Sequence, residues 1–95
     1  MYKLTRLVTL ADSGRLSALA DEMRALGAAH AADRTLVAPT LAGSHFGGDL
    51  LAHFAFDDAV KRADFDAALA PLLATPAVAS VDGVAYRTGA GGKSE

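Results

Sequence analysis

A histidine inside an apolar stretch is the feature of this sequence that most suggests chemistry. His53 lies between Ala52 and Phe54 in the run DLLAHFAF. Burial among apolar neighbours lowers the pKa of an imidazole, because the charged form loses its hydration. A neutral imidazole can act as a general base near neutral pH. His53 is therefore a candidate catalytic base, although a lone histidine of this kind is more often a hydrogen-bonded core residue.

Two further polar side chains could orient a substrate. Arg6 shares the strand parity of Leu4 and Val8, so its guanidinium is expected near the core, where it needs a carboxylate. That carboxylate could come from a ligand or, more simply, from the protein itself. Tyr86 lies near the end of the last expected strand and could donate a hydrogen bond in a pocket or fill the core. Arg6 is thus a candidate for substrate binding and Tyr86 a second catalytic candidate.

The segment GSHFGG adds another histidine and an aromatic ring. His45 and Phe46 could close over a pocket from this connection. Phe46 could equally anchor the connection or pack between subunits. The glycines do not form a phosphate-binding loop, since no Lys-Ser/Thr pair follows them. Together with Phe54 as an apolar wall, His45 and Phe46 join Arg6 in the candidate substrate-binding set.

Composition excludes several kinds of site. The chain has no cysteine, which removes thiolate catalysis and cysteine-ligated zinc, and its three histidines lack metal-ligand spacing. We therefore predict neither a metal nor a cofactor. The four aspartates between residues 57 and 66 are explained more simply as helix caps than as an acid–base pair. A net charge of −2 without a basic stripe argues against nucleic acid as a partner.

Hydrophobic periodicity predicts the elements that must position these residues. Period-two alternation or short apolar runs predict strands over 2–10, 35–41, 49–56 and 78–87. Helical spacing predicts one helix that follows Asp12 and Ser13 and ends between 30 and 33. A second helix is expected over 59–70, with Pro71 ending or bending it. Pro39 marks the second strand as an edge strand, and Gly83 suggests a bulge in the last.

The order strand, helix, strand, strand, helix, strand predicts a fold. It is that of an α+β, ferredoxin-like β-α-β-β-α-β sandwich, with two helices on one face of a four-stranded antiparallel sheet. Residues 1–88 form this single domain, and 89–95 are expected to be a flexible tail.

The run DLLAHFAF also predicts a partner. It is apolar at both strand parities, whereas two helices can cover only one face of the sheet. The second face is most simply covered by another copy of the same sheet, which gives a homodimer and a dimeric α+β barrel.

Three stretches resemble a known family. The segments KLTRLVTL, GGDLLAHFAFDD and ASVDGVAYR resemble those of the stress-responsive A/B barrel (Dabb) family, within the dimeric α+β barrel superfamily. The resemblance spans nearly all of residues 2–88 and implies a homodimer. Some relatives are polyketide cyclases that use histidines and a tyrosine between sheet and helices. Residues 62–65, RADF, stand where the family has His-Pro-Ala-His, so the usual histidines are missing.

Three functions remain open at this point. The first is a small binding or structural homodimer without an assigned activity. The second is a cofactor-free enzyme, polyketide-cyclase-like or monooxygenase-like, that acts on a small hydrophobic or aromatic molecule; it would need a cavity of a few hundred Å³ beside His53. The third is a small-ligand-sensing module. The first ten residues lack the apolar core of a signal peptide, and no apolar run is long enough to span a membrane, so we expect a cytoplasmic protein.

Overall fold

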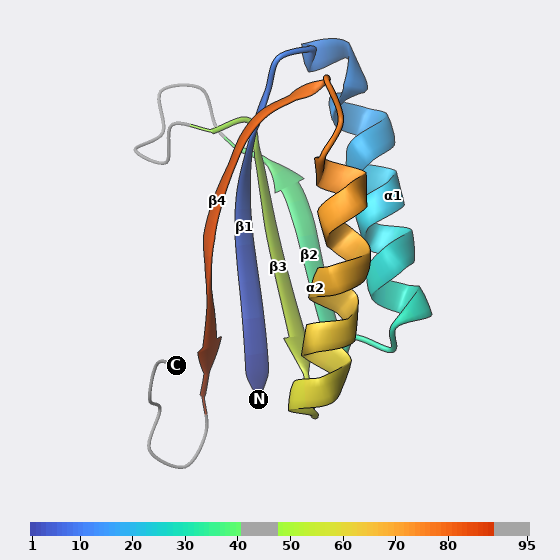
Figure 1. Cartoon of the computed structure of the whole chain (residues 1–95), viewed down its shortest axis with the longest axis vertical. Coiled ribbons are helices and arrows are strands. Elements are labelled where there is room, and N and C mark those ends of the chain that lie inside the picture. The colour runs from blue at the N-terminus through green and yellow to red at the C-terminus, as the bar shows by residue number, and fades with distance from the viewer. Residues whose placement is uncertain (41–47, 89–95) are drawn as a thin grey trace.

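The computed structural model describes residues 1–40 and 48–88 (Figure 1). Its elements, in chain order, are β1 (Tyr2–Leu10), a 3-10 turn (Ser13–Arg15), α1 (Leu16–Ala29), β2 (Arg34–Pro39), β3 (Leu50–Phe56), α2 (Ala59–Leu73) and β4 (Val78–Arg87). This is the predicted β-α-β-β-α-β order. No helix in the described part of the chain is long and apolar enough to cross a membrane.

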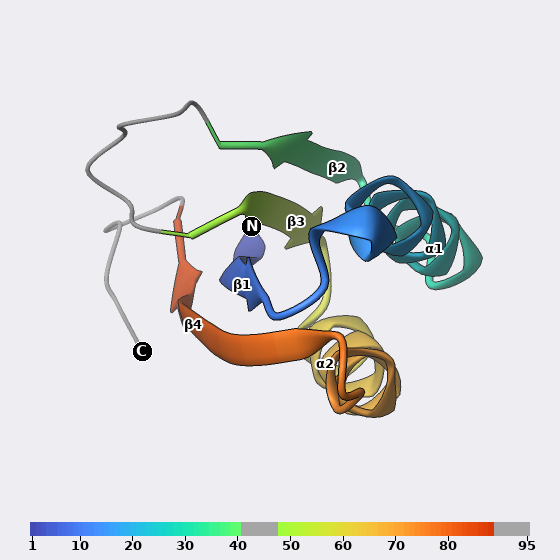
Figure 2. The same ribbon diagram turned by 90° about the horizontal axis from the view of Figure 1, so that it is seen from above.

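The four strands form one antiparallel sheet in the order β2-β3-β1-β4. Both helices lie on the same side of it, and no helix of residues 1–40 and 48–88 lies on the other side (Figure 2). The predicted ferredoxin-like arrangement is therefore confirmed. β2 is an edge strand, as Pro39 at its end suggested.

Aspartates start both helical segments, as the sequence predicts. The Asp12 side chain accepts a hydrogen bond from the backbone N–H of Gly14 at the 3-10 turn that leads into α1. The Asp58 side chain accepts one from the N–H of Val60 at the start of α2. These carboxylates satisfy backbone donors that the first turn of a helix leaves unpaired.

Pro71 does not end α2, and Gly83 does not form the predicted bulge. α2 continues through Pro71 to Leu73, and the N–H of Ala74 bonds to the Pro71 carbonyl. A proline this close to the end removes one helical hydrogen bond, after which the last turn can still close. At Gly83 the register is regular, and the irregularity in the β1–β4 ladder falls at Thr9/Leu10 instead.

Gly83 is required for a different reason. It lies opposite Arg6 with a φ of 153°, a conformation that side-chain-bearing residues rarely adopt. A Cβ atom there would come within 1.9 Å of the Thr5 carbonyl oxygen. The position is therefore a close approach of two backbones, which only glycine allows.

The hydrophobic core lies between the sheet and the helices. Phe54 and Phe56 of β3 and Phe65 of α2 are fully buried, and their rings meet with centroid distances of 4.4 Å (Phe54–Phe65) and 5.2 Å (Phe56–Phe65). Leu4 and Val8 of β1 belong to the same buried cluster. Such aromatic packing contributes much of the stability of a small domain.

The side of the sheet that faces away from the helices is called the open face here. Alternation along the strands and the register assign to it these residues: Lys3, Thr5, Leu7 and Thr9 (β1), Arg34, Leu36 and Ala38 (β2), Leu51, His53 and Ala55 (β3), Ser80, Asp82, Val84 and Tyr86 (β4). Leu36 and Val84 are 55% and 60% exposed. The open face thus has an apolar middle between polar ends, because β1 and β4 contribute charged and hydroxyl side chains beside the apolar β3.

Candidate functional site

The sheet separates the candidate residues into two groups. Arg6 points to the helix side with Leu4 and Val8, whereas His53 lies on the open face, paired with Thr5. Tyr86 pairs with Lys3 and is also on the open face. A single site that contains both Arg6 and His53 is therefore excluded by the geometry.

The remaining candidates, Phe54, His45 and Phe46, cannot be added to the group of Arg6 or to the group of His53. Phe54 is fully buried in the core against Phe65 and lines neither of the two regions described next. His45 and Phe46 lie outside the described residues.

Arg6 is held beneath α2 by two hydrogen bonds. One guanidinium nitrogen lies 3.1 Å from Asp66 Oδ1, and the other donates to the backbone carbonyl of Thr5 at 3.0 Å. The Arg6 side chain is 19% exposed and that of Asp66 48%. The carboxylate that the sequence required for Arg6 thus comes from the protein, and no further polar partner of Arg6 lies within the described ranges.

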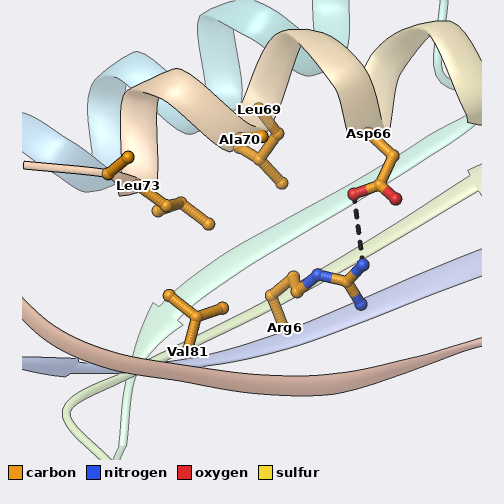
Figure 3. Close-up of a pocket in the computed structure, with 7 residues that line it drawn as sticks. Arg6, Asp66, Leu69, Ala70, Leu73 and Val81 are labelled. Carbon is orange, nitrogen blue, oxygen red and sulfur yellow. Dashed lines mark hydrogen bonds and ion pairs between the residues drawn. The ribbon is translucent and has the colours of Figure 1, made fainter.

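Arg6 and Asp66 lie at one end of a crevice between α2 and β4 (Figure 3). Its volume is about 310 Å³, and its remaining lining is apolar or small: Leu69, Ala70, Leu73, Ala74 and Val81. Arg6 and Val81 point from the sheet toward the helix, and Leu69 and Leu73 point back (Figure 3). The crevice exists because β4 is exposed along most of its length, with its helix side not covered by α2.

Sequence reasoning missed the crevice, although α2 carries a signal for it. Asp66, Leu69 and Leu73 recur at spacings of three and four, so they share one helical face. The helix was expected over 59–70, which leaves out Leu73, and Asp66 was explained as a helix cap. The open side of the crevice depends on the path of β4, which no local pattern in the sequence encodes.

On the open face, His53 has two polar neighbours. Its Nδ1 atom is hydrogen-bonded to Thr5 Oγ1 at 3.0 Å, and its ring centroid lies 6.4 Å from that of Tyr86. Burial lowers the pKa of His53 below 6.5, and the positive charges of Lys3 and Arg34 lower it further. The imidazole is therefore neutral at pH 7, as predicted, and can accept or relay a proton. It is not part of the lining of the crevice.

Beside His53 is a hollow with two cations on its sides. It has a volume of about 170 Å³ and is lined by Met1, Lys3, Asp33, Arg34 and Ala55. Lys3 and Arg34 flank Ala55 in register, so the small buried Ala55 is the floor between two long basic side chains. Within the described ranges neither cation forms an ion pair. We call this the cationic hollow.

The chain ends of the described domain meet next to the cationic hollow. The Met1 ammonium donates to the Thr88 carbonyl at 2.7 Å, and the Thr88 N–H donates to the Met1 carbonyl at 2.8 Å.

A third depression lies between the helices and has little polar character. It has a volume of about 380 Å³ and is lined by Ala25, Leu26, Ala29, Ala68, Leu72 and Glu22. Among residues 1–40 and 48–88 no three His, Asp or Glu side chains come together as a metal site would need.

Comparison of the chain with protein-family models, with curated proteins and with solved structures gives no match. The resemblance to the stress-responsive A/B barrel family therefore rests on the three sequence stretches alone and stays a prediction.

Proposed function

We propose that this protein is a homodimeric binding protein for a small, mainly apolar molecule, which occupies the crevice between α2 and β4. One observation carries the proposal: the ion pair of Arg6 and Asp66 lies at one end of an otherwise apolar crevice. At about 310 Å³ the crevice lies at the lower end of the range of roughly 300–1,000 Å³ for small-molecule sites. Such sites typically combine apolar walls with few polar groups that fix orientation.

The charge of the crevice favours an uncharged ligand. Asp66 neutralises Arg6, so a carboxylate ligand would meet repulsion from Asp66 as well as attraction to Arg6. A guanidinium has five N–H donors, and two hydrogen bonds use only part of them. The remaining donors suit a carbonyl or hydroxyl oxygen. We therefore expect a neutral molecule with one such oxygen and an aromatic or aliphatic body.

The homodimer is proposed on the open face. Leu36 and Val84 expose most of their side chains there, and Leu7 and Leu51 are only partly buried between them. Contact with a second copy would remove this apolar surface from water, which is the main driving force of association. The resemblance to the stress-responsive A/B barrel family supports the same arrangement.

Ligand binding is tested with three probes of one size. Acetophenone carries a carbonyl oxygen, ethylbenzene has none, and benzoate adds a charge. NMR titration should shift the methyl signals of Leu69, Leu73 and Val81 with acetophenone. Because a hydrogen bond to a charged group contributes about 1.5–3 kcal/mol, acetophenone should bind at least about tenfold more tightly than ethylbenzene. Benzoate should bind more weakly than acetophenone.

A variant assigns this preference to Arg6. Arg6→Met keeps an unbranched apolar side chain and removes the donors, so acetophenone should bind it no better than ethylbenzene. Arg24→Met removes an arginine of α1 whose ion pair is with Asp21, and should leave the preference unchanged. Equal affinities for all three probes, or shifts spread over the whole surface, would refute the ligand proposal.

The homodimer is tested by light scattering at micromolar concentration. The proposal expects twice the mass of one chain, and a single-chain mass across this range contradicts it.

A second candidate function uses the other group of residues. His53 is neutral and lies near Tyr86. In a cofactor-free enzyme, His53 could act as the base and Tyr86 as a hydrogen-bond donor. Its substrate would have to lie on the open face and would compete with the second copy. Turnover by a monomeric form that is lost in His53→Ala would favour the enzyme over the binding protein.

A further inference from the structure

We infer that in the homodimer the Asp82 carboxylate of each copy enters the cationic hollow, between Lys3 and Arg34, of the other copy. This inference rests on the proposed homodimer and adds to it the relative orientation of the two sheets. It follows from the placement of the charges on the open face.

The cationic hollow has room and charge for a carboxylate. Lys3 and Arg34 stand on either side of the buried Ala55, whose methyl group leaves space above it. Neither cation has an ion-pair partner in the parts of the chain that the structure describes. Burying both cations under a second sheet without an anion would cost much of their hydration free energy. Asp33 also lines the hollow but forms no ion pair with Lys3 or Arg34 among the described residues, and it can balance only one of the two positive charges. The hollow therefore needs a further negative group once the open face is covered.

Asp82 is the matching group on the same face. It lies opposite Leu7 on the exposed strand β4 and forms no ion pair with any described residue. It is the acidic residue among the strand positions of the open face. A carboxylate in the covered interface would itself need a cation, so the two requirements complement each other.

The register places Asp82 and the hollow symmetrically about Thr5. Asp82 lies on β4, to one side of β1, and pairs with Leu7, which is two residues after Thr5. Ala55 lies on β3, to the other side of β1, and pairs with Lys3, which is two residues before Thr5. A two-fold axis that passes between the sheets at Thr5 therefore exchanges Asp82 of one copy with the hollow of the other, twice in each dimer.

The same axis also brings apolar residues together. It is oblique to the strands, so the strands of the two sheets cross steeply, as in orthogonal sheet packing. Applied to the register, it places Leu51 of one copy near Leu36 of the other, and His53 near Leu7. One orientation thus satisfies both the charges and the apolar middle of the open face.

The experiment exchanges charges between two variants. In Asp82→Lys, a lysine meets the cationic hollow in both contacts of the dimer. In the double variant Lys3→Glu with Arg34→Glu, Asp82 meets an acidic hollow in both contacts. Because each contact occurs twice, we expect either variant alone to dimerise about a hundredfold more weakly than the unmodified protein. Circular dichroism and thermal unfolding confirm that each variant still folds.

Mixing the two variants is the decisive step. In a mixed dimer, the introduced lysine meets the acidic hollow and the remaining Asp82 meets the intact cationic hollow, so both contacts are attractive again. Native mass spectrometry should show a one-to-one heterodimer with an affinity within about tenfold of the original. Asp64→Lys, which makes the same charge change at an exposed position of α2, is the matched control and should leave dimerisation unchanged.

The outcomes separate this inference from the homodimer itself. A mixture of folded variants that stays monomeric overturns the inference, and so does an Asp82→Lys variant that dimerises like the unmodified protein. In the second case the homodimer stands with a different orientation. If the unmodified protein is itself monomeric at micromolar concentration, the proposed homodimer fails and the inference fails with it.

Discussion

The two faces of the sheet differ most clearly at two adjacent residues of β3. Phe54 points into the core and is fully buried, and His53 points to the open face, where it remains partly accessible. The helix side carries the buried hydrophobic cluster beneath the helices, with the crevice and Arg6 at the β4 side of it. The open face combines an apolar middle with charges that form no ion pair among residues 1–40 and 48–88. One side of the sheet therefore carries the buried core, and the other leaves apolar and charged side chains accessible.

The largest difference in the free energy of unfolding should appear when Phe54 and His53 are each replaced by alanine. Phe54→Ala removes a ring that packs against Phe65, and should lower the free energy of unfolding by about 3–5 kcal/mol. His53→Ala on the open face should cost less than about 1 kcal/mol. Urea unfolding followed by circular dichroism measures both values. Equal losses would show that the two faces are packed alike.

A backbone position that supports both faces should give the next largest effect. Gly83→Ala would drive a methyl group into the Thr5 carbonyl and force a strained φ, and should cost about 3 kcal/mol. Ser80→Ala, on the exposed part of the same strand, is the control and should change stability by less than about 0.5 kcal/mol. Thermal unfolding of the two variants measures the loss of stability in each. A fully stable Gly83→Ala would mean that β4 does not approach β1 as closely as described.

Exposed apolar residues on the two sides of the molecule should behave differently in assembly. Leu36→Ser on the open face should weaken dimerisation by about tenfold or more, since each dimer loses two buried leucine side chains. Val60→Ser on α2 removes a valine that is 66% exposed and should leave dimerisation unchanged. Light scattering over a dilution series compares them. The reverse ranking would place the interface on the helices.

The smallest effect is a pH dependence confined to the open face. Burial and the nearby cations hold the pKa of His53 below 6.5, so the folded protein binds the proton less well than the unfolded chain. The contribution of His53 is present in full above pH 6.5 and is lost as the pH falls from 6.5 through the folded pKa. His53→Asn should flatten this part of the stability profile. Unfolding measured from pH 7.5 to 5.5 would show no difference if the imidazole were unperturbed.

Residue patterns within single elements predicted most of the fold. The alternation in YKLTRLVTL and VASVDGVAYR gave strand ends that the structure reproduces at both β1 and β4. Asp12 and Asp58 marked the helix starts through the ordinary chemistry of capping. The predicted helix end at Pro71 was wrong by three residues, because a proline two residues before the end of a helix removes too little hydrogen bonding to stop it.

The candidate site was less accessible to such reasoning. The parity of Arg6 correctly placed it on the core side, but which aspartate would pair with it depends on how α2 crosses the sheet. The apolar run around His53 suggested an apolar open face, yet half of that face comes from β1 and β4, with Lys3, Thr5 and Asp82. The composition of a face is set by neighbouring strands that lie far apart in the sequence, so a single strand cannot reveal it.

The two backbone hydrogen bonds between Met1 and Thr88 have a practical consequence. A linker of a few residues could join these positions, and new termini could be opened between β3 and α2, at the exposed Asp57 and Asp58. Such a circular permutant would keep both faces of the sheet while changing the order in which the strands leave the ribosome. It would also move any purification tag away from the neighbourhood of Lys3 and Arg34.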